Sequence, residues 1–183
     1  MILDMYTSYE DVRFARTDNL KGLDEHQRLN KRIESAEALL AIIPIGKKFS
    51  SIRTEVAGVT VSDYQERGWG YSLQNRANHS NNIQAIADFS RAIELSKLAD
   101  KEPELRLFEA RGACYLYQKM PNQAIEDANS IINISECAEA YLLRGNAHSQ
   151  IGNYTRAKAD VTYAMAIATR IQEKYSAFDL YSK

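Results

Sequence analysis

One spaced pattern occurs three times in this 183-residue chain, and it constrains the fold more than any other feature. Each copy has an aromatic residue, glycine or leucine four positions later, alanine twelve positions after that, and aspartate three positions beyond the alanine. The three copies are Trp69, Leu73, Ala85 and Asp88; Phe108, Gly112, Ala124 and Asp127; and Tyr141, Gly145, Ala157 and Asp160. Repeats of about this length are typical of stacked structural units rather than of a catalytic domain.

Composition limits the classes of function that the chain can serve. Apolar residues make up 45% and charged residues 26%, as in ordinary globular proteins. The net charge of -1 provides no long-range attraction to nucleic acid or to an anionic membrane. The first residues do not have the basic start and apolar run of a secretory signal, and the longest apolar stretch, residues 36–45, is too short to span a membrane. We therefore expect a cytoplasmic protein.

Apolar residues recur at helical spacing along most of the chain. Asp24 with Gln27 resembles a capping box and predicts a helix over 24–42, and Ser62 with Gln65 predicts a second start. The further helices are predicted at 83–98, 103–118, 121–133, 136–151 and 154–175. Residues 1–22 show no clear period and are interpreted as a partly ordered arm, and residues 45–60 fit either a short helix or an extended connection. The sequence thus predicts an all-α chain.

These rows resemble the tetratricopeptide repeat (TPR) family, whose unit is a helix–turn–helix of 34 residues. The third copy matches best, through Tyr141, Arg144, Gly145, Tyr154 and Ala157, whereas Leu73 stands in the first copy where glycine is normal. The resemblance implies an α-solenoid, a right-handed superhelical stack of antiparallel helix pairs with an N-terminal helical extension. It divides the chain into an N-terminal arm, amphipathic helix and connecting segment (1–61), three repeats (62–172) and a C-terminal capping extension (173–183).

Small residues explain why such a pattern packs closely. The glycines and alanines let neighbouring helix backbones approach, while the aromatic residues fill the space between units. The alanines at 85, 124 and 157 advance by 39 and then 33 positions, so we expect an extended helix or loop near Lys97–Glu104. The ends of the stack need covers, and we expect helix 24–42 and the extension through Ile171 and Tyr175 to supply them.

The resemblance also implies a site. In this family the first helix of each unit lines a concave groove that receives a peptide or helix of a partner protein. The matching positions are Arg67, Gly70, Gln74 and Asn78; Arg106, Glu109, Ala113 and Tyr117; and Glu139, Leu142, Asn146 and Gln150. Amide side chains can bind a peptide backbone and Tyr117 can anchor an apolar group, although the same residues would also suit a plain solvated face.

Other kinds of site find little support in the sequence. Family members that clamp the acidic tail of heat-shock chaperones use cations and amides, but the matching positions here include Ala110, Glu139 and Leu143. Asp88, Asp127 and Asp160 follow the repeat spacing, so we expect them to face solvent or a neighbouring basic residue. His148 occupies a core position, and Cys114 and Cys137 lie too far apart for a zinc site or a disulfide framework. No catalytic set, metal or cofactor is predicted.

Three functions remain open at this stage. The first is a non-catalytic interaction module, an adaptor, scaffold or assembly factor that binds a partner peptide or helix in the groove. The second is a structural subunit of a larger complex, or a self-associating solenoid, that docks through the apolar segment Leu39–Ile45 with Phe49 and Ile52. The third is an enzyme with a site in residues 1–62, for which the sequence offers no residues. We predict the first, with no nucleic acid partner and no membrane insertion.

Overall fold

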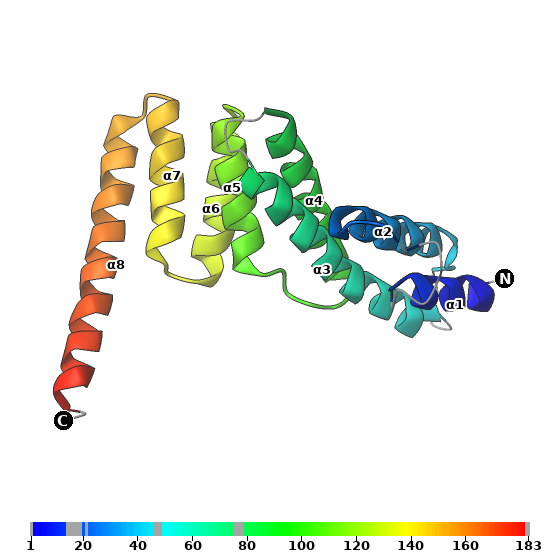
Figure 1. Ribbon diagram of the computed structural model, residues 1–183. Coiled ribbons are helices and arrows are strands. Elements are labelled where there is room, and N and C mark those ends of the chain that lie inside the picture. The colour runs from blue at the N-terminus through cyan, green and yellow to red at the C-terminus, as the bar shows by residue number, and fades with distance from the viewer. Residues whose placement is uncertain (1, 14–19, 21, 46–48, 75–78, 182–183) are drawn as a thin grey trace. The chain divides into compact units, whose positions relative to one another are not determined.

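The computed structural model describes residues 2–13, 20, 22–45, 49–74 and 79–181 (Figure 1). The side chains of residues 2, 3, 74 and 173–181 lie outside this description. Within the described residues the regular elements are all helices: α1 (Ile2–Arg13), α2 (Glu25–Ile42), α3 (Ser50–Gln74), α4 (His79–Leu98), α5 (Leu105–Tyr117), α6 (Pro121–Ile134), α7 (Ala138–Gln150) and α8 (Tyr154–Tyr181). Consecutive helices pack on one another, as in α1 with α2 and α6 with α7. The prediction of an all-α solenoid is confirmed.

The chain divides into two compact units. Unit 1 holds residues 1–74 and 84–107, and unit 2 holds residues 75–83 and 108–183. The core of unit 1 is built from buried aliphatic and aromatic side chains of α2, α3 and α4, among them Leu39, Val56 and Phe89. The core of unit 2 is mostly alanine, with Ala128, Ala147 and their neighbours fully buried. Such small side chains allow the close helix approach that the sequence pattern predicts.

Local interactions fix both ends of α2. The Asp24 carboxylate accepts a hydrogen bond from the Gln27 backbone amide at 2.7 Å, and the Gln27 side chain accepts one from the Asp24 amide at 3.0 Å. This capping box confirms the predicted start. At the other end the Arg53 guanidinium donates to the carbonyls of Leu40 and Ile43 at 2.9 and 3.1 Å, groups that the end of a helix leaves without partners.

Two predictions for the N-terminal part are wrong. Residues 2–13 form helix α1 rather than an arm without a period, and Tyr9 of this helix is buried. Ser62 does not begin a helix, because α3 runs without a break from Ser50 to Gln74. The predicted boundary at residue 61 therefore falls inside a helix, and residues 50–60 of the segment left open above form its first turns. The division of the chain into three regions stays a prediction.

The first repeat has a different register from the one read in the sequence. In unit 2, Arg111 and Arg144 each stand one position before the packed glycine and bind the aspartate of the following helix. In unit 1 the residue that binds Asp88 in this way is Arg67, and Gly68 follows it. Tyr64, not Trp69, is thus the aromatic residue equivalent to Phe108 and Tyr141. The departure at Leu73 disappears, because Gly68 is the glycine of this copy.

Contacts of the arginines with aromatic rings and with asparagines also support the corrected register. The guanidinium of each arginine lies over the aromatic ring three positions before it, at 5.2 Å for Tyr64, 5.7 Å for Phe108 and 5.2 Å for Tyr141. Arg67 also donates to the Asn30 amide oxygen on α2 at 2.9 Å, as Arg144 does to that of Asn129 on α6 at 2.8 Å. Seventeen positions separate glycine from alanine in this copy and twelve in the others, so the first repeat carries five additional residues.

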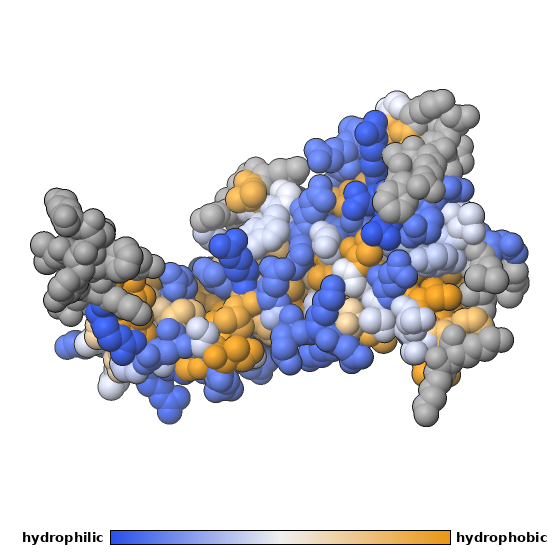
Figure 2. All heavy atoms as spheres, turned by 90° about the horizontal axis from the view of Figure 1, so that it is seen from below, coloured by the Kyte–Doolittle hydropathy of each residue, from blue (hydrophilic) through white to orange (hydrophobic). Residues whose placement is uncertain are grey.

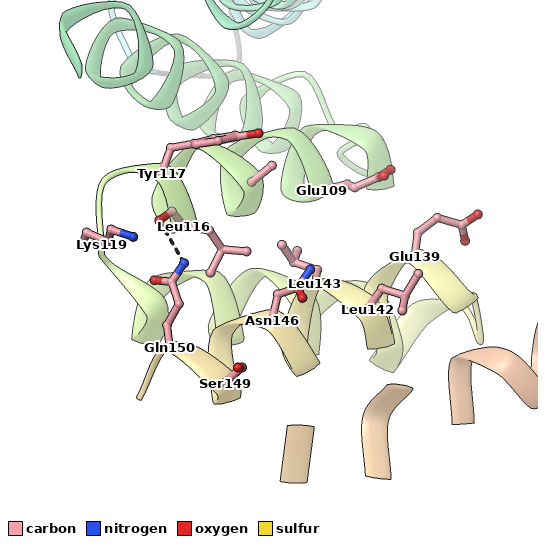
Figure 3. Close-up of a pocket in the computed structure, with 11 residues that line it drawn as sticks. Glu109, Leu116, Tyr117, Lys119, Glu139, Leu142, Leu143, Asn146, Ser149 and Gln150 are labelled. Carbon is pink, nitrogen blue, oxygen red and sulfur yellow. Dashed lines mark hydrogen bonds between the residues drawn. The ribbon is translucent and has the colours of Figure 1, made fainter. Parts of the chain in front are cut away.

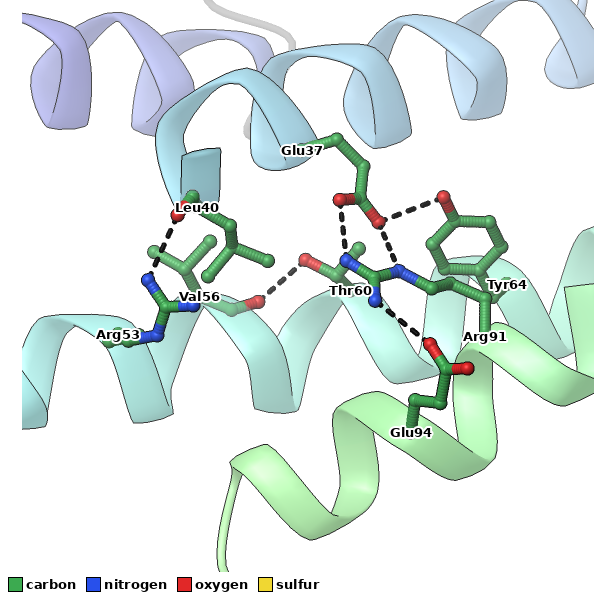
Figure 4. Close-up of polar contacts among 8 residues, drawn as sticks. All are labelled: Glu37, Leu40, Arg53, Val56, Thr60, Tyr64, Arg91 and Glu94. Carbon is green, nitrogen blue, oxygen red and sulfur yellow. Dashed lines mark hydrogen bonds and ion pairs between the residues drawn. The ribbon is translucent and has the colours of Figure 1, made fainter. Parts of the chain in front are cut away.

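A polar network joins three helices of unit 1 (Figure 4). The Arg91 guanidinium of α4 donates to both Glu37 carboxylate oxygens of α2 at 2.8 and 2.7 Å, and to Glu94 at 3.0 Å. The Tyr64 hydroxyl of α3 donates to the same Glu37 carboxylate at 2.9 Å. Burial alone raises the pKa of Glu37, but these hydrogen bonds and the Arg91 charge hold it below its usual 4.5.

The apolar N-terminal segment is used inside unit 1. Leu39, Leu40 and Ile43 are buried, and of the segment Leu39–Ile45 the large side chain that remains exposed is Ile45, at 92%. Phe49 and Ile52 are half-buried. This packing removes the observation that favoured docking of another subunit through the segment, because its apolar surface already stabilises its own unit.

The expected change near Lys97–Glu104 is present. Helix α4 has 20 residues, whereas α6 has 14, and a connection at 99–104 follows it with Asp100 in the left-handed region at a φ of 51°. At the other end of the chain the predicted extension continues α8 as helix to Tyr181. Ile171 on it is 47% exposed, and the side chains from Lys174 onward, Tyr175 among them, lie outside the description, so the predicted covering role stays a prediction.

Candidate partner-binding groove

A groove of about 660 Å³ runs between α5 and α7 within unit 2 (Figure 3). Its lining consists of Glu109, Ala113, Leu116, Tyr117 and Lys119 from α5 and the turn after it, and Glu139, Leu142, Leu143, Asn146, Ser149 and Gln150 from α7. A groove of this size fits the side chains and backbone of a short segment of protein, and it lies in the range of known ligand pockets.

The groove follows from helical periodicity. The lining residues recur three or four positions apart on each helix, so each set lies on one face. Cys114 of α5 and Ala147 of α7 lie beside these faces and are buried. Amphipathic helices that bury one face and leave the other open produce a groove wherever two open faces lie side by side.

Close packing beneath the groove sets its floor. A Cβ atom added at Gly112 of α5 would lie 2.6 Å from Leu143 Cδ2 of α7, so glycine is needed for the present position of Leu143. Behind α7, the Arg144 guanidinium donates to both Asp160 oxygens at 3.0 and 2.7 Å. The first contact sets the separation of α5 and α7, and the largely buried ion pair holds α7 against α8.

The two ends of the groove carry opposite charges (Figure 3). Glu109 and Glu139 lie at one end, at the N-terminal parts of their helices, and Lys119 lies at the other. Within the described part of the chain neither carboxylate forms an ion pair. Between the ends lie apolar side chains, of which Tyr117 is 50% and Leu142 42% exposed.

Polar groups complete the lining. The Gln150 side-chain amide donates to the Leu116 carbonyl at 3.2 Å, which ties the end of α7 to α5. Asn146 and Ser149 are exposed on the same face. Asn146 has both a donor and an acceptor and can therefore bind the backbone of an extended segment in the groove.

The structure brings together five of the residues predicted as partner-binding, Glu109, Tyr117, Glu139, Asn146 and Gln150, and also Ala113 and Leu142. Arg106 is exposed on α5 but does not line the groove. Asn78 lies outside the described residues, and so does the side chain of Gln74. That all these residues contact a partner stays a prediction.

Arg67 was predicted to line the partner-binding groove, but its side chain is engaged inside unit 1. Its guanidinium donates to Asp88 at 2.8 and 2.7 Å and to Asn30, so its hydrogen-bonding capacity serves the interior of unit 1. The error follows from the register taken in the first repeat. In the corrected register the α3 positions equivalent to Ala113 and Tyr117 are Trp69 and Leu73, which are 38% and 67% exposed.

The prediction missed four residues of the lining: Leu116, Lys119, Leu143 and Ser149. Lys119 lies in the turn after α5 with a φ of 59°, where helical spacing no longer predicts direction. A non-glycine residue in the left-handed region is uncommon, and no sequence pattern around Lys119 signals it. Ser149 and Leu116 each stand next to a predicted position, so a wider helical face would have included them.

The repeated aspartates are structural. Asp88, Asp127 and Asp160 are 4%, 3% and 7% exposed and pair with Arg67, Arg111 and Arg144. Of the two expected surroundings, solvent or a basic neighbour, the structure shows the basic neighbour. Burial raises the pKa of Asp127, opposed by the hydrogen bonds and charge of Arg111. His148 is buried, as a packing residue would be.

Two features of the described residues bear on metal binding and on membrane crossing. No group of three or more His, Cys, Asp or Glu side chains there could hold a metal ion. No helix there combines the length and apolar character that a membrane crossing requires. On the face shown in Figure 2, apolar side chains form short patches between hydrophilic ones.

Comparison with known proteins gives one weak similarity. No protein-family model matches the chain. The TPR repeat-containing thioredoxin TDX of Arabidopsis thaliana is 35% identical over 94 residues, which is 49% of this chain and 25% of that protein. The chain thus spans about a quarter of the length of the curated relative it matches. The similarity and the helical stack both agree with the repeat family that the sequence pattern resembles.

Proposed function

We propose that the chain is a TPR-type interaction module that binds a segment of a partner protein in the groove between α5 and α7. The observation that carries the proposal is the convergence of five predicted partner-binding residues on one open groove. Exposed Tyr117 and Leu142 can each cover an apolar side chain of the partner, and the Asn146 amide can bind a backbone group. As an adaptor or scaffold in the cytoplasm, the chain would need this binding surface and no catalytic residues.

The repeat architecture supports binding rather than catalysis. A groove between two rigid helices presents fixed side chains to a ligand without large rearrangement, which lowers the entropic cost of binding. Within unit 2, the bidentate ion pair of Arg144 with Asp160 lies behind the groove and holds two helices together. The name of the relative includes a thioredoxin, but this chain has no Cys-x-x-Cys pair, since its cysteines are Cys114 and Cys137.

Selection from a displayed library of random peptides tests this function without knowledge of the partner. The full chain is the bait, and the enriched peptides are then measured against a variant carrying Tyr117→Ala and Asn146→Ala. Both side chains are exposed, so helicity by circular dichroism should not change. We expect peptides that bind the wild-type chain and lose at least about tenfold in affinity for the variant.

A matched control variant carries Tyr154→Ala and Asn122→Ala. These residues are also exposed, on α8 and α6, and neither lines the groove. The selected peptides should bind this control as they bind the wild type. Peptides that bind both variants equally well would place the site elsewhere, and failure to enrich any peptide would contradict the proposal.

A further inference from the structure

The charge distribution of the groove specifies more than the presence of a ligand. Two carboxylates, Glu109 and Glu139, lie at one end from two different helices, and the structure gives neither an ion-pair partner among the described residues. The nearby Glu136, by contrast, is bound by Tyr163 and by Arg170 at 2.7 Å. The acidic end therefore keeps its charge available to a ligand.

The middle of the groove is apolar and the far end is basic. Leu116, Leu142 and Leu143 line the middle with Tyr117, and Lys119 lies beyond them. A basic side chain is attracted to the acidic end and repelled by Lys119 at the other, so the two ends impose one direction on a charged ligand. An acidic ligand would face the reverse and would meet two carboxylates at the acidic end.

Helix geometry gives the distance between the acidic end of the groove and its apolar middle. Glu109 and Leu116 are separated by seven residues of α5, which is about 10 Å along the helix axis. An extended peptide covers about 3.3 Å per residue, so this distance corresponds to about three residues of ligand. The groove thus fits a basic and an apolar side chain about three positions apart.

We infer that the groove between α5 and α7 binds an extended segment of a partner protein in which a lysine or arginine lies about three residues from a leucine-like side chain. The basic side chain lies between Glu109 and Glu139, and the apolar one covers Leu116 beside Tyr117. Asn146, midway on α7, hydrogen-bonds the backbone between them. This inference rests on the proposed function, and it adds the chemistry and the direction of the ligand.

The test uses three fluorescein-labelled octapeptides and the full chain. Each peptide has leucine at one position and lysine, glutamine or glutamate three positions away in the same serine–alanine background. Fluorescence anisotropy measures the dissociation constants at low salt. We expect the lysine peptide to bind about three- to tenfold more tightly than the glutamine peptide, and the glutamate peptide to bind least, because exposed ion pairs contribute modestly. Added salt should reduce the difference.

Charge variants locate the effect. Glu109→Gln with Glu139→Gln should abolish the preference for lysine, while Glu102→Gln with Glu126→Gln changes the net charge equally at exposed positions outside the groove and should preserve it. Glu109→Lys with Glu139→Lys should reverse the preference toward the glutamate peptide. A reversal of this kind cannot arise from partial unfolding.

The outcomes separate this inference from the proposed function. Equal binding of the three peptides, lost in the variant with Tyr117→Ala and Asn146→Ala, would overturn the inference and leave the groove as a binding site. Selected library peptides that require the groove but lack a basic residue would do the same. Binding of the lysine peptide that does not depend on Glu109 and Glu139 would also overturn it, and so would the absence of binding of the lysine peptide.

Discussion

Arg67 on α3 and Asp88 on α4 form a bidentate ion pair, with the guanidinium donating at 2.8 and 2.7 Å to the two carboxylate oxygens. The pair recurs as Arg111 with Asp127, and its third copy is formed on α7 and α8. In each copy the arginine immediately precedes the glycine that lets the helices approach. The same two residues thus mark the register of each repeat and hold its two helices together.

The first prediction concerns this pair. Arg67→Met leaves the buried Asp88 carboxylate without its partner and should lower the free energy of unfolding by about 3 kcal/mol. Adding Asp88→Leu to that variant should recover most of the loss, because an apolar pair needs no desolvation of charge. Urea unfolding followed by circular dichroism measures both.

Ser72 provides the control for that prediction. It stands three positions after Trp69, where the first-read register would place the arginine, and its hydroxyl donates only to the Trp69 carbonyl at 3.0 Å. Ser72→Ala should change stability by no more than about 0.5 kcal/mol. A large loss at Ser72 together with a small one at Arg67 would contradict the corrected register.

The second prediction compares two glycines of α3. An added Cβ at Gly68 would lie 2.8 Å from Phe89 Cε1 in the core of unit 1, whereas at Gly70 nothing lies within 4 Å. Gly68→Ala should therefore cost about 1–3 kcal/mol through overpacking. Gly70→Ala should raise stability by about 0.5–1 kcal/mol, because alanine favours the helix. Thermal unfolding of the two variants decides the sign, and a stable Gly68→Ala protein would contradict the packing described.

The sequence predicted α5, α6 and α7 to within about two residues, and also the starts of α2 and α8, because the Asp24 capping box, Pro121 and the repeat spacing act locally. The predicted end of α8 was six residues short, since 154–175 was expected and the helix continues to Tyr181. It did not predict the register of the first repeat. Trp69 happens to lie sixteen positions before Ala85, the spacing found in the other copies, and five additional residues displace the true aromatic residue, Tyr64. The contacts of Arg67 with Asp88, with Asn30 and with the Tyr64 ring distinguish the two registers.

The groove was predicted in part for a similar reason. Tyr117 and Asn146 were included because the family resemblance implies groove positions on the first helix of each repeat. The direction of Lys119 depends on a left-handed turn, and the availability of Glu109 and Glu139 depends on which acidic residues find partners in the folded chain. Neither can be derived from spacing.

The third prediction concerns pH and His148. Burial lowers the pKa of this imidazole below 6.5, an effect that Asp160 opposes and that Arg156 and Arg144 reinforce. Below pH 6.5 the unfolded chain takes up a proton that the folded chain does not, so the free energy of unfolding should decrease as the pH falls from 6.5 toward the folded-state pKa. His148→Leu should remove this component of the pH dependence.

Chemical unfolding between pH 8 and 5 measures this dependence, with His79→Leu as a control at an exposed position. The control should retain the slope of the wild type. Equal slopes for wild type and His148→Leu would show that this histidine is protonated equally in the folded and unfolded chains.

The fourth prediction concerns Glu37, whose pKa is held below 4.5 although burial by itself raises it. A carboxylate with a lowered folded-state pKa adds stability that is complete above pH 4.5 and is lost as the pH falls through the folded value. Glu37→Gln weakens the bonds from Arg91 and Tyr64 and should cost about 1 kcal/mol at pH 7, a modest amount because the pair is partly exposed. The difference from wild type should remain constant from pH 7 to 5 and close below pH 4.5.

Glu94→Gln is the matched control, because Glu94 binds the same Arg91 guanidinium but is 66% exposed and joins no second helix. Solvent screening makes such a pair worth little, so this variant should differ from wild type by less than about 0.5 kcal/mol. Urea unfolding of the three proteins at pH 7 and pH 3.5 completes the comparison. If Glu94→Gln were as costly as Glu37→Gln, any carboxylate paired with Arg91 would contribute equally to stability. The connection that Glu37 makes between α2, α3 and α4 would then add nothing.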